Sequence, residues 1–472
     1  MTVQLYDSQT QSLRDFVPLV EGRVGLYVCG PTVQSSPHIG HLRSALNYDQ
    51  LRRWLEYSGY TVTLVRNVTD IDDKVLVNAT DAEPWWALAY RVELEFSRGY
   101  AALDILPPTY EPRATANIPD MIALIERLIS RGHAYPASDG SGDVYFDTRS
   151  WRSYGSLTRQ RLDDMEAAAD SEVRAKHDAR DFALWKGTKE GEPDTASWSS
   201  PWGPGRPGWH IECSAMSTRY LGPRFDIHGG GLDLRFPHHE NELAQSTAAG
   251  DDFANYWVHN GLVSVAGQKM SKSLGNSIYA ADLLAAARPI VIRYFLGAAH
   301  YRSTLEFHDG ALAEAEAALD RIEVFLTRSA RRLKSTRFES AEIVVVPDEF
   351  REAMDDDLNV PQALAVLHDR VRAGNAALDA EQLENAATSR GEVLAMTTVL
   401  GINPLAPQWQ STSSVAVGDA LHILIRRLLT QRQEARAARD FAAADRIRAE
   451  LADAGILIED GPNGSHWRID GE

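Results

Sequence analysis

Hydrophobic and polar residues follow two different periods in the first part of the chain. Residues 24–28 form a short apolar run typical of a buried strand, and residues 60–65 resume a β-rich pattern. Between them, apolar residues recur at helical spacing from Leu42 to Leu55, and Ser58-Gly59 closes that stretch. The pattern predicts a strand–helix–strand unit of an α/β fold.

The second part of the chain has another pattern. From about Ala311 the sequence is rich in Ala, Glu, Leu and Arg and poor in strand formers, which predicts a helical bundle to about Leu400. Pro361 fits the first turn of a helix within it. A Pro/Ser/Thr-rich link, 403–414, leads to a small terminal module, and we find no internal repeat.

Length and charge narrow the class of protein. A chain of 472 residues is too long for one core and predicts about three domains. Its apolar runs fall short of the roughly 20 residues that span a bilayer, and its first residues lack a signal-peptide pattern. The net charge of −18 argues against indiscriminate nucleic-acid binding. Residues 426–448 nevertheless hold seven arginines against three acidic residues, which is a solvated helix face or a local basic patch.

Two short runs carry candidate chemistry. The first, which we call the histidine run, is His38-Ile39-Gly40-His41 and lies where the first predicted strand gives way to the helix. A helix N-terminus offers N–H groups and a positive dipole end to a triphosphate, and His38 and His41 can add donors. The second, which we call the lysine run, is 269–273, with Lys269 and Lys272 on a Gly- and Ser-bounded loop able to close over phosphates. Together they indicate a nucleotide-activating site.

The two cysteines define a second candidate site. Cys29 ends the first predicted strand, and Cys213 follows a Pro/Gly/Trp-rich stretch. His238 and Glu242 are four residues apart and share a face if that stretch is helical, whereas His239 would point to a different face. Two thiolates, an imidazole and a carboxylate are a zinc ligand set. Spacing alone equally allows two buried cysteines and a surface His–Glu pair.

The two runs together resemble class I aminoacyl-tRNA synthetases, and four flanking stretches resemble signatures of the cysteinyl-tRNA synthetase family. These stretches are 26–32, 66–74, 208–216 and 236–242, and the likeness continues into 460–467. The resemblance implies a Rossmann-like catalytic domain with an insertion, then a helical bundle and a C-terminal anticodon-binding module. The expected segments are 1–112 and 206–260 for the two catalytic halves, 113–205 for the insertion at the acceptor end of tRNA, 261–310 for the lysine-loop and stem-contact region, 311–402 for the bundle, and 415–472 for the module.

The resemblance also implies the reaction. L-Cysteine is activated by ATP to cysteinyl-adenylate with release of pyrophosphate, and is then transferred to the 3′ end of tRNA(Cys). Cys29, Cys213, His238 and Glu242 match the family's zinc ligands one by one, and zinc that prefers a thiolate to a hydroxyl would reject serine. We expect one Zn²⁺ per chain, Mg²⁺ with ATP, no membrane partner, and a cytoplasmic monomer.

Further residues are expected around the substrates. The triphosphate is expected to bind to His38, His41, Lys269 and Lys272, with Lys272 as the main ATP contact. Gly230 would let the backbone approach adenosine, and Asp233 would accept from ribose hydroxyls; a tight structural turn is the alternative. The amino-acid pocket is expected to contain Cys29, Thr69, Trp209 and His228, and His228 could also contact the base or the adenylate. Core packing is the alternative role of Trp209.

The terminal module resembles the family's anticodon-reading domain. Candidate readers of the anticodon bases are Arg436, Asp445 and Asp460, with Phe441 as a stacking platform. A helical hairpin with charge pairs four residues apart is the alternative.

Two other functions compete with tRNA charging. A cysteine ligase acting on an amino-sugar in thiol biosynthesis would share the catalytic part but lack the terminal module. A catalytically silent tRNA-binding paralogue would lack the residues of the histidine or lysine run, which are intact here.

Overall fold

The computed structural model describes most of the chain. The described residues are 2–166, 175–265, 267–269, 276–339, 345–409, 425, 427–436, 440–461 and 464–469. They form two compact units, Met1–Pro404 and Leu405–Glu472. None of the described helices combines the length and apolarity that a membrane span would need.

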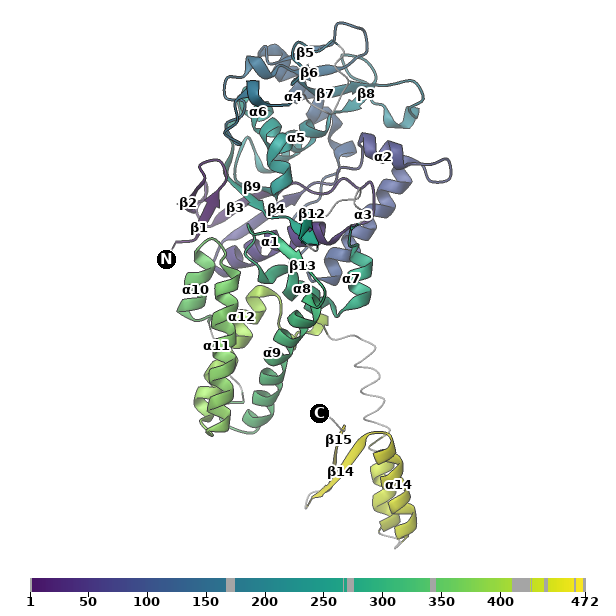
Figure 1. Ribbon diagram of the computed structural model, residues 1–472, viewed down its shortest axis with the longest axis vertical. Coiled ribbons are helices and arrows are strands. Elements are labelled where there is room, and N and C mark those ends of the chain that lie inside the picture. The colour runs from purple at the N-terminus through teal and green to yellow at the C-terminus, as the bar shows by residue number, and fades with distance from the viewer. Residues whose placement is uncertain are drawn as a thin grey trace. The chain divides into compact units, whose positions relative to one another are not determined.

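A four-stranded parallel sheet lies in the middle of the first unit (Figure 1). Its strands, in spatial order, are β10 (Phe253–Asn260), β9 (Arg224–Gly231), β3 (Arg23–Val28) and β4 (Thr61–Arg66). The strand interiors are apolar and buried, as Leu26 and Ile227 illustrate. Burial on both faces is the rule for parallel strands, because helices cover the sheet from either side.

Two helices connect these strands and define where a ligand can bind. The helix α1 (Ile39–Tyr57) links β3 to β4, and α6 (Glu240–Ala248) lies between β9 and β10. The predicted strand–helix–strand unit is therefore confirmed, with Ser58 capping the helix. The chain leaves the adjacent strands β3 and β9 in opposite directions along the sheet. Ligands of open parallel sheets bind in the crevice at the carboxyl ends of such a strand pair.

The segment between the two sheet halves contains helices and a second sheet. Its helices are α2 (Asp73–Asn78), α3 (Trp85–Ala102) and α4 (Ile118–Ser130), and α5 (Trp209–Leu221) leads back to the central sheet. An antiparallel sheet is formed by β5 (Ala134–Pro136), β6 (Val144–Phe146), β7 (Phe182–Gly187) and β8 (Gly205–Pro207). This sheet lies at one end of the unit (Figure 1). The sequence did not predict it, because three of its strands have only three residues.

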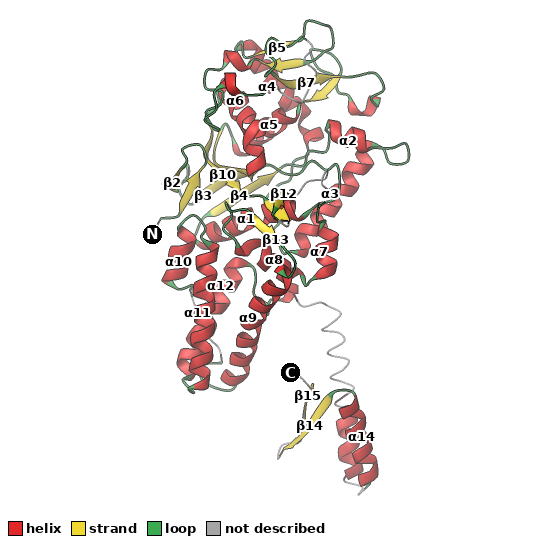
Figure 2. Ribbon diagram, in the orientation of Figure 1, coloured by secondary structure: helices red, strands yellow, loops and turns green. Residues whose placement is uncertain are grey.

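A helical region occupies the other end of the unit (Figure 2). It contains α7 (Ala280–Ala286), α8 (Pro289–Ala298), α9 (Ala311–Leu333), α10 (Asp348–Asp355), α11 (Val360–Asp379) and α12 (Leu383–Leu400). Pro361 lies in the first turn of α11, as predicted, and Asn359 caps that helix by accepting from the Gln362 N–H. Because proline has no N–H to leave unpaired there, the position costs the helix nothing.

Short strands complete the first unit. The N-terminal hairpin consists of β1 (Gln4–Asp7) and β2 (Ser12–Asp15). In a third sheet, β11 (Val263–Val265) pairs with β12 (Gln268–Lys269) and with β13 (Leu305–Phe307).

The second unit is a small α/β module. It contains helical turns over residues 427–436, the helix α14 (Phe441–Asp453), and a hairpin of β14 (Ile456–Gly461) and β15 (Gly464–Ile469). Its buried core is Ile425, Leu429, Leu451 and Ile456. The β-hairpin distinguishes it from a plain helical hairpin.

Candidate active site

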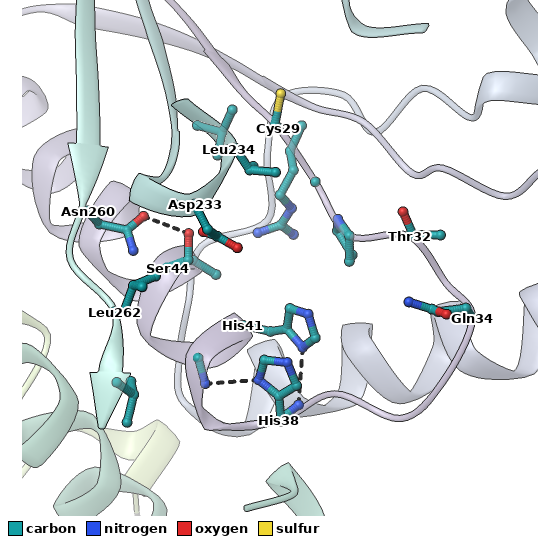
Figure 3. Close-up of a pocket in the computed structure, with 18 of the residues that line it drawn as sticks. Cys29, Thr32, Gln34, His38, His41, Ser44, Asp233, Leu234, Asn260 and Leu262 are labelled. Carbon is teal, nitrogen blue, oxygen red and sulfur yellow. Dashed lines mark hydrogen bonds between the residues drawn. The ribbon is translucent and has the colours of Figure 1, made fainter. Parts of the chain in front are cut away.

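A cavity of about 360 Å³ opens at the carboxyl ends of β3 and β9. Its wall includes residues 28–32, 34 and 35 and the start of α1. Residues 231, 233 and 234, at the end of β9 and just after it, and residues 260–263, at the end of β10 and just after it, complete the wall (Figure 3). The cavity therefore lies at the strand pair where the parallel sheet predicts a ligand.

His38 and His41 form the N-terminus of α1 at one side of this cavity. His38 is the N-cap, and its Nδ1 accepts from the Gly40 N–H at 3.2 Å. His41 Nδ1 accepts from the His38 N–H, also at 3.2 Å, and the two rings stack with centroids 3.6 Å apart. Since Nδ1 is the acceptor in both neutral rings, Nε2 carries the proton in each. Two imidazole donors and a helix N-terminus thus line one end of the cavity, an arrangement that suits an anion.

The two flanks of the lysine run have different neighbours, and the C-terminal flank contacts this helix start. On the N-terminal flank, Lys269 is in β12, whose backbone pairs with Ser264 of β11. On the C-terminal flank, the Ile278 carbonyl accepts from the Ile39 N–H at 2.9 Å. The side chains of Lys269 and Lys272 lie outside the described residues, so their contacts with phosphate remain predictions.

Cys29, at the other end of the cavity, belongs to a buried cluster of ligand-type atoms. The atoms of Cys29, Cys213, His238 and Glu242 all lie within 4.8 Å of one another. Cys29 Sγ is 3.5 Å from Cys213 Sγ and 3.3 Å from Glu242 Oε1, and His238 Nε2 is 3.1 Å from the same oxygen. Zinc bonds of 2.0–2.3 Å in a tetrahedron separate ligand atoms by about 3.5 Å. The donor set and its spacing therefore fit zinc.

Burial sets the protonation of this cluster in the protein alone. Desolvation, together with Cys213 and Glu242, raises the pKa of the Cys29 thiol well above its usual value. Desolvation also lowers the pKa of His238 to about 3, so its imidazole is neutral and can act as a ligand. A bound divalent cation reverses the effect on the thiols, because it stabilises thiolate.

Helical spacing had predicted that His239 points to a different face from His238 and Glu242. In the structure, His239 instead lies beside the cluster. Its Nε2 is 4.0 Å from Glu242 Oε1, and Cys29, His228, His239 and Glu242 form a second, overlapping set of ligand-type atoms. The backbone explains this difference, because residues 235–239 form a wide turn in which Phe236 is extended. The face assignment of a regular α-helix does not apply there.

His228 and Thr69 lie behind the cavity and not in its wall. His228 is fully buried, its Nε2 is 2.8 Å from Glu242 Oε2, and its ring stacks on Trp257. The position suits orienting Glu242 and not contact with a base or an adenylate. Thr69 is also buried and donates to Glu212 Oε2 at 2.8 Å.

Trp209 does line the cavity, at the first residue of α5. Its ring stacks on His238 with centroids 4.2 Å apart, and Lys74 Nζ lies 5.9 Å from the ring centroid. The side chain therefore connects the cavity to the ligand cluster.

The last two glycines of β9, Gly230 and Gly231, have different surroundings. A Cβ on Gly230 would lie 2.7 Å from His239 Cε1, so this glycine is needed for close packing and is not in the cavity wall. Gly231 and Asp233 do line the cavity, and Figure 3 shows Asp233 there. Sequence reasoning missed Arg66, Tyr100 and Asn260, which also line it. Tyr100 and Asn260 come from segments without a recognisable motif, and only the fold brings them here.

The candidate anticodon readers lie in the second unit. Phe441 begins α14 and is 61% exposed, and Asp445 is exposed one turn later on the same helix. Arg436 is exposed in the preceding helical turns. The side chain of Asp460 lies outside the described residues.

Comparison with known proteins agrees with this geometry. Residues 15–317 match the family described as tRNA synthetases class I (C) catalytic domain, residues 349–404 match the DALR domain, and residues 421–468 match the cysteinyl-tRNA ligase anticodon binding domain. The fold also resembles Mycobacterium tuberculosis methionyl-tRNA synthetase in complex with methionyl-adenylate. That similarity has a TM-score of 0.59 at 16% identity, over 80% of this chain and 90% of that one.

The fold and the cavity define an aminoacyl-tRNA ligase of class I. Curated relatives narrow the family further. The chain is 74% identical to the cysteine–tRNA ligase of Clavibacter sepedonicus and 70% identical to that of Leifsonia xyli subsp. xyli, in each case over 100% of both chains. The chain belongs to the cysteinyl-tRNA synthetase family.

Proposed function

We propose that the enzyme activates L-cysteine with ATP to cysteinyl-adenylate, releasing pyrophosphate, and then transfers the cysteinyl group to the 3′ end of tRNA(Cys). The observation that carries this proposal is one cavity with an anion-binding helix start, His38 and His41, at one end and Cys29 of the ligand cluster at the other. ATP and a thiol substrate would therefore meet between them.

Cys29, Cys213, His238 and Glu242 would hold one zinc ion. When bound, zinc supplies a site that prefers thiolate strongly to a neutral hydroxyl, which is the difference between cysteine and serine. A purely apolar pocket would separate these two near-isosteres poorly. Trp209 would close the pocket beside His238, and His228 would hold the second oxygen of Glu242.

The phosphate end works mainly by positioned charge. Attack of the cysteine carboxylate on the α-phosphate places negative charge on the phosphate oxygens, so fixed donors and cations lower the barrier. His38 and His41 would donate from Nε2, and Lys269 and Lys272 would close over the phosphates, with Mg²⁺ entering as part of the ATP complex. Asp233 would accept from the ribose hydroxyls, next to Gly231.

The second unit supports tRNA as the acceptor over an amino-sugar. This unit matches an anticodon binding domain, which a tRNA ligase would use and an amino-sugar ligase would not need. Phe441, exposed at the start of α14, offers a stacking surface for an unpaired base, and Arg436, Asp445 and Asp460 would read base edges.

Cysteine-dependent exchange of pyrophosphate into ATP tests the first step. The purified enzyme should exchange with cysteine and not with serine. Aminoacylation of tRNA(Cys), run beside an amino-sugar acceptor, tests the second. Exchange without tRNA charging, but with ligation to the sugar, would replace the tRNA proposal by the alternative.

A further inference from the structure

Tyr27 in β3 is a tyrosine whose hydroxyl is buried without a completed hydrogen bond. Its side chain is fully buried, and its ring centroid lies 5.4 Å from that of His228. Within the described part of the chain, its hydroxyl makes no hydrogen bond of ordinary geometry. A buried hydroxyl left in this way destabilises the folded chain, and phenylalanine would fill the same space without that cost. Packing therefore explains the ring but not the hydroxyl.

The hydroxyl lies beside the proposed zinc ligands. Tyr27 and Cys29 are two positions apart, and the extended pairing continues past β3 because the Cys29 N–H donates to the Gly229 carbonyl at 3.0 Å. Their side chains therefore leave the sheet on the same face. Burial raises the pKa of the Cys213 thiol, whereas the neighbouring donor groups of Cys29 and Tyr27 lower it. The Tyr27 hydroxyl is thus near the Cys213 sulfur and favours its thiolate form.

Zinc binding would change the hydrogen bonds of both cysteines. In the protein alone, Cys29 Sγ donates to Cys213 Sγ at 3.5 Å and is 3.3 Å from Glu242 Oε1. These contacts depend on a thiol proton, which cysteine loses when it becomes a metal ligand. Cys213 would then be a thiolate that no longer accepts from Cys29. A buried thiolate needs a donor, and the Tyr27 hydroxyl is beside it.

The charge of the ligand set gives such a donor a role in substrate binding. Two thiolates and one carboxylate exceed the charge of one zinc ion by one negative charge, and all four ligands are buried. A cysteine substrate that binds as a thiolate adds a further negative charge. Donors around the ligands offset this charge, as His228 Nε2 does at 2.8 Å from Glu242 Oε2. A donor to the Cys213 sulfur would have the same effect.

We propose that Tyr27 is a positioning residue of the zinc site, whose hydroxyl donates to the Cys213 thiolate when zinc is bound and thereby favours binding of the substrate thiolate. Tyr27 acts through Cys213, because it does not line the cavity itself. The inference rests on the proposed function and adds to it a residue that adjusts how strongly the site binds cysteine.

The test compares Tyr27→Phe with Tyr256→Phe in the full-length enzyme. Tyr256, in β10 of the same sheet, is also buried, but its hydroxyl donates to the Asp15 carbonyl at 2.8 Å and accepts from the Val17 N–H at 3.0 Å. Pyrophosphate exchange gives KM for cysteine and for ATP, and zinc content and Tm are measured on the same preparations. Enzyme produced with Co²⁺ in place of zinc gives the wavelength of the sulfur-to-metal charge-transfer band.

We expect Tyr27→Phe to raise the KM for cysteine by about tenfold, the lower end of the effect of removing a partner of a metal ligand. The KM for ATP should not change. The charge-transfer band should move to longer wavelength, because a thiolate that accepts no hydrogen bond transfers charge to the metal more easily. Tyr256→Phe should lower Tm, because its hydroxyl has partners to lose, and should change neither KM nor the band. Both variants should keep about one zinc per chain.

Three results would overturn the inference while leaving the proposed function intact. These are an unchanged KM for cysteine in Tyr27→Phe, an unmoved band in that variant, or an equal rise in KM in Tyr256→Phe. A wild-type enzyme without zinc, or without cysteine-dependent exchange, would instead contradict the proposed function.

A second variant keeps the test decisive if Tyr27→Phe does not fold. Replacing Tyr27 by meta-fluorotyrosine keeps the ring and the hydroxyl and makes the hydroxyl a stronger donor. The charge-transfer band should then move to shorter wavelength and the KM for cysteine should fall. A band and a KM that both stay at the wild-type values would overturn the inference.

Discussion

His210 Nδ1 lies 2.9 Å from His238 Nδ1, with both rings fully buried. One of the two nitrogens must donate. Burial lowers the pKa of His210 to about 3, so both rings are neutral. If His238 uses Nε2 as a ligand, its Nδ1 carries the proton and donates a hydrogen bond to His210 Nδ1. His210 thereby fixes both the tautomer and the ring orientation of the ligand.

This relationship predicts that His210→Ala weakens zinc binding by about 10- to 100-fold, the usual effect of removing a partner of a metal-bound histidine. His210→Asn should bind nearly as well as the wild type, because the Asn carbonyl can accept in place of Nδ1. Competition with a chromophoric chelator measures the affinity. Equal affinity in all three proteins would mean that this hydrogen bond does not orient His238.

The ligand set itself predicts about one zinc per chain in the purified protein. Cys213→Ser should lose most of it, because a serine hydroxyl is a poor zinc ligand compared with a thiolate. Ser214→Ala is the matched control, since Ser214 is buried next along the same helix and donates to Gln245. Metal analysis of the two variants decides the point, and full zinc in Cys213→Ser would remove Cys213 from the site.

Lys272→Ala should slow adenylate formation by about 10²–10³, the cost of one lost electrostatic contact in a transition state. Cysteine binding should barely change, because the proposed zinc ligands, Cys29, Cys213, His238 and Glu242, are left intact. Lys189→Ala, a change in an exposed turn of the insertion, serves as control. Should exchange proceed at the wild-type rate, the lysine run is not the ATP clamp.

Deleting the chain from Thr412 onward should separate the two half-reactions. Every described residue of the cavity wall lies between Val28 and Ser277, in a unit with its own core. The truncated enzyme should therefore keep cysteine-dependent exchange, while its affinity for tRNA falls steeply and it discriminates less against anticodon variants. Normal tRNA charging by the truncated enzyme would contradict the anticodon-binding assignment.

The ion pairs of Asp73 are expected to make a pH-dependent contribution to the free energy of unfolding. It pairs with the buried cations Lys186 at 2.9 Å and Arg206 at 2.7 Å, which attaches α2 to the insertion sheet. Burial alone would raise the pKa of Asp73. The two cations lower it by more than burial raises it, so the pKa falls to about 2. Because the folded pKa lies below the unfolded value, the stabilisation is full above about pH 4 and is lost as pH falls toward 2.

Asp73→Asn should accordingly lower the free energy of unfolding at pH 7 by about 1–3 kcal/mol. The lower end is expected, because the Asp73 side chain is 43% exposed and solvent screens the pair. Urea unfolding at pH 7 and at pH 3 measures the difference between variant and wild type. A difference that does not shrink at the lower pH would rule out the ion pairs as its cause.

Local sequence was sufficient for the elements whose signal is periodic. The helix that begins at Ile39 and ends at Tyr57 was predictable from apolar spacing, and so was the proline-led helix at Val360. The histidine run and the four zinc-ligand types were also visible as residues. Their local chemistry, donors at a helix start and soft ligands for zinc, follows from residue type alone.

Tertiary structure decided where the side chains point. His228 had been expected at the substrate, yet it stacks on Trp257 behind Glu242, because a parallel strand is buried on both faces and its sequence does not reveal which face is which. Cys29 meets Cys213 across 184 positions in sequence, a contact that only the folded sheet creates. The sequence shows Arg43 as one more arginine on a helix. Only the packing of α1 against residues 261–262 and 300–303 buries it on four backbone carbonyls, since burial is a property of what surrounds a residue.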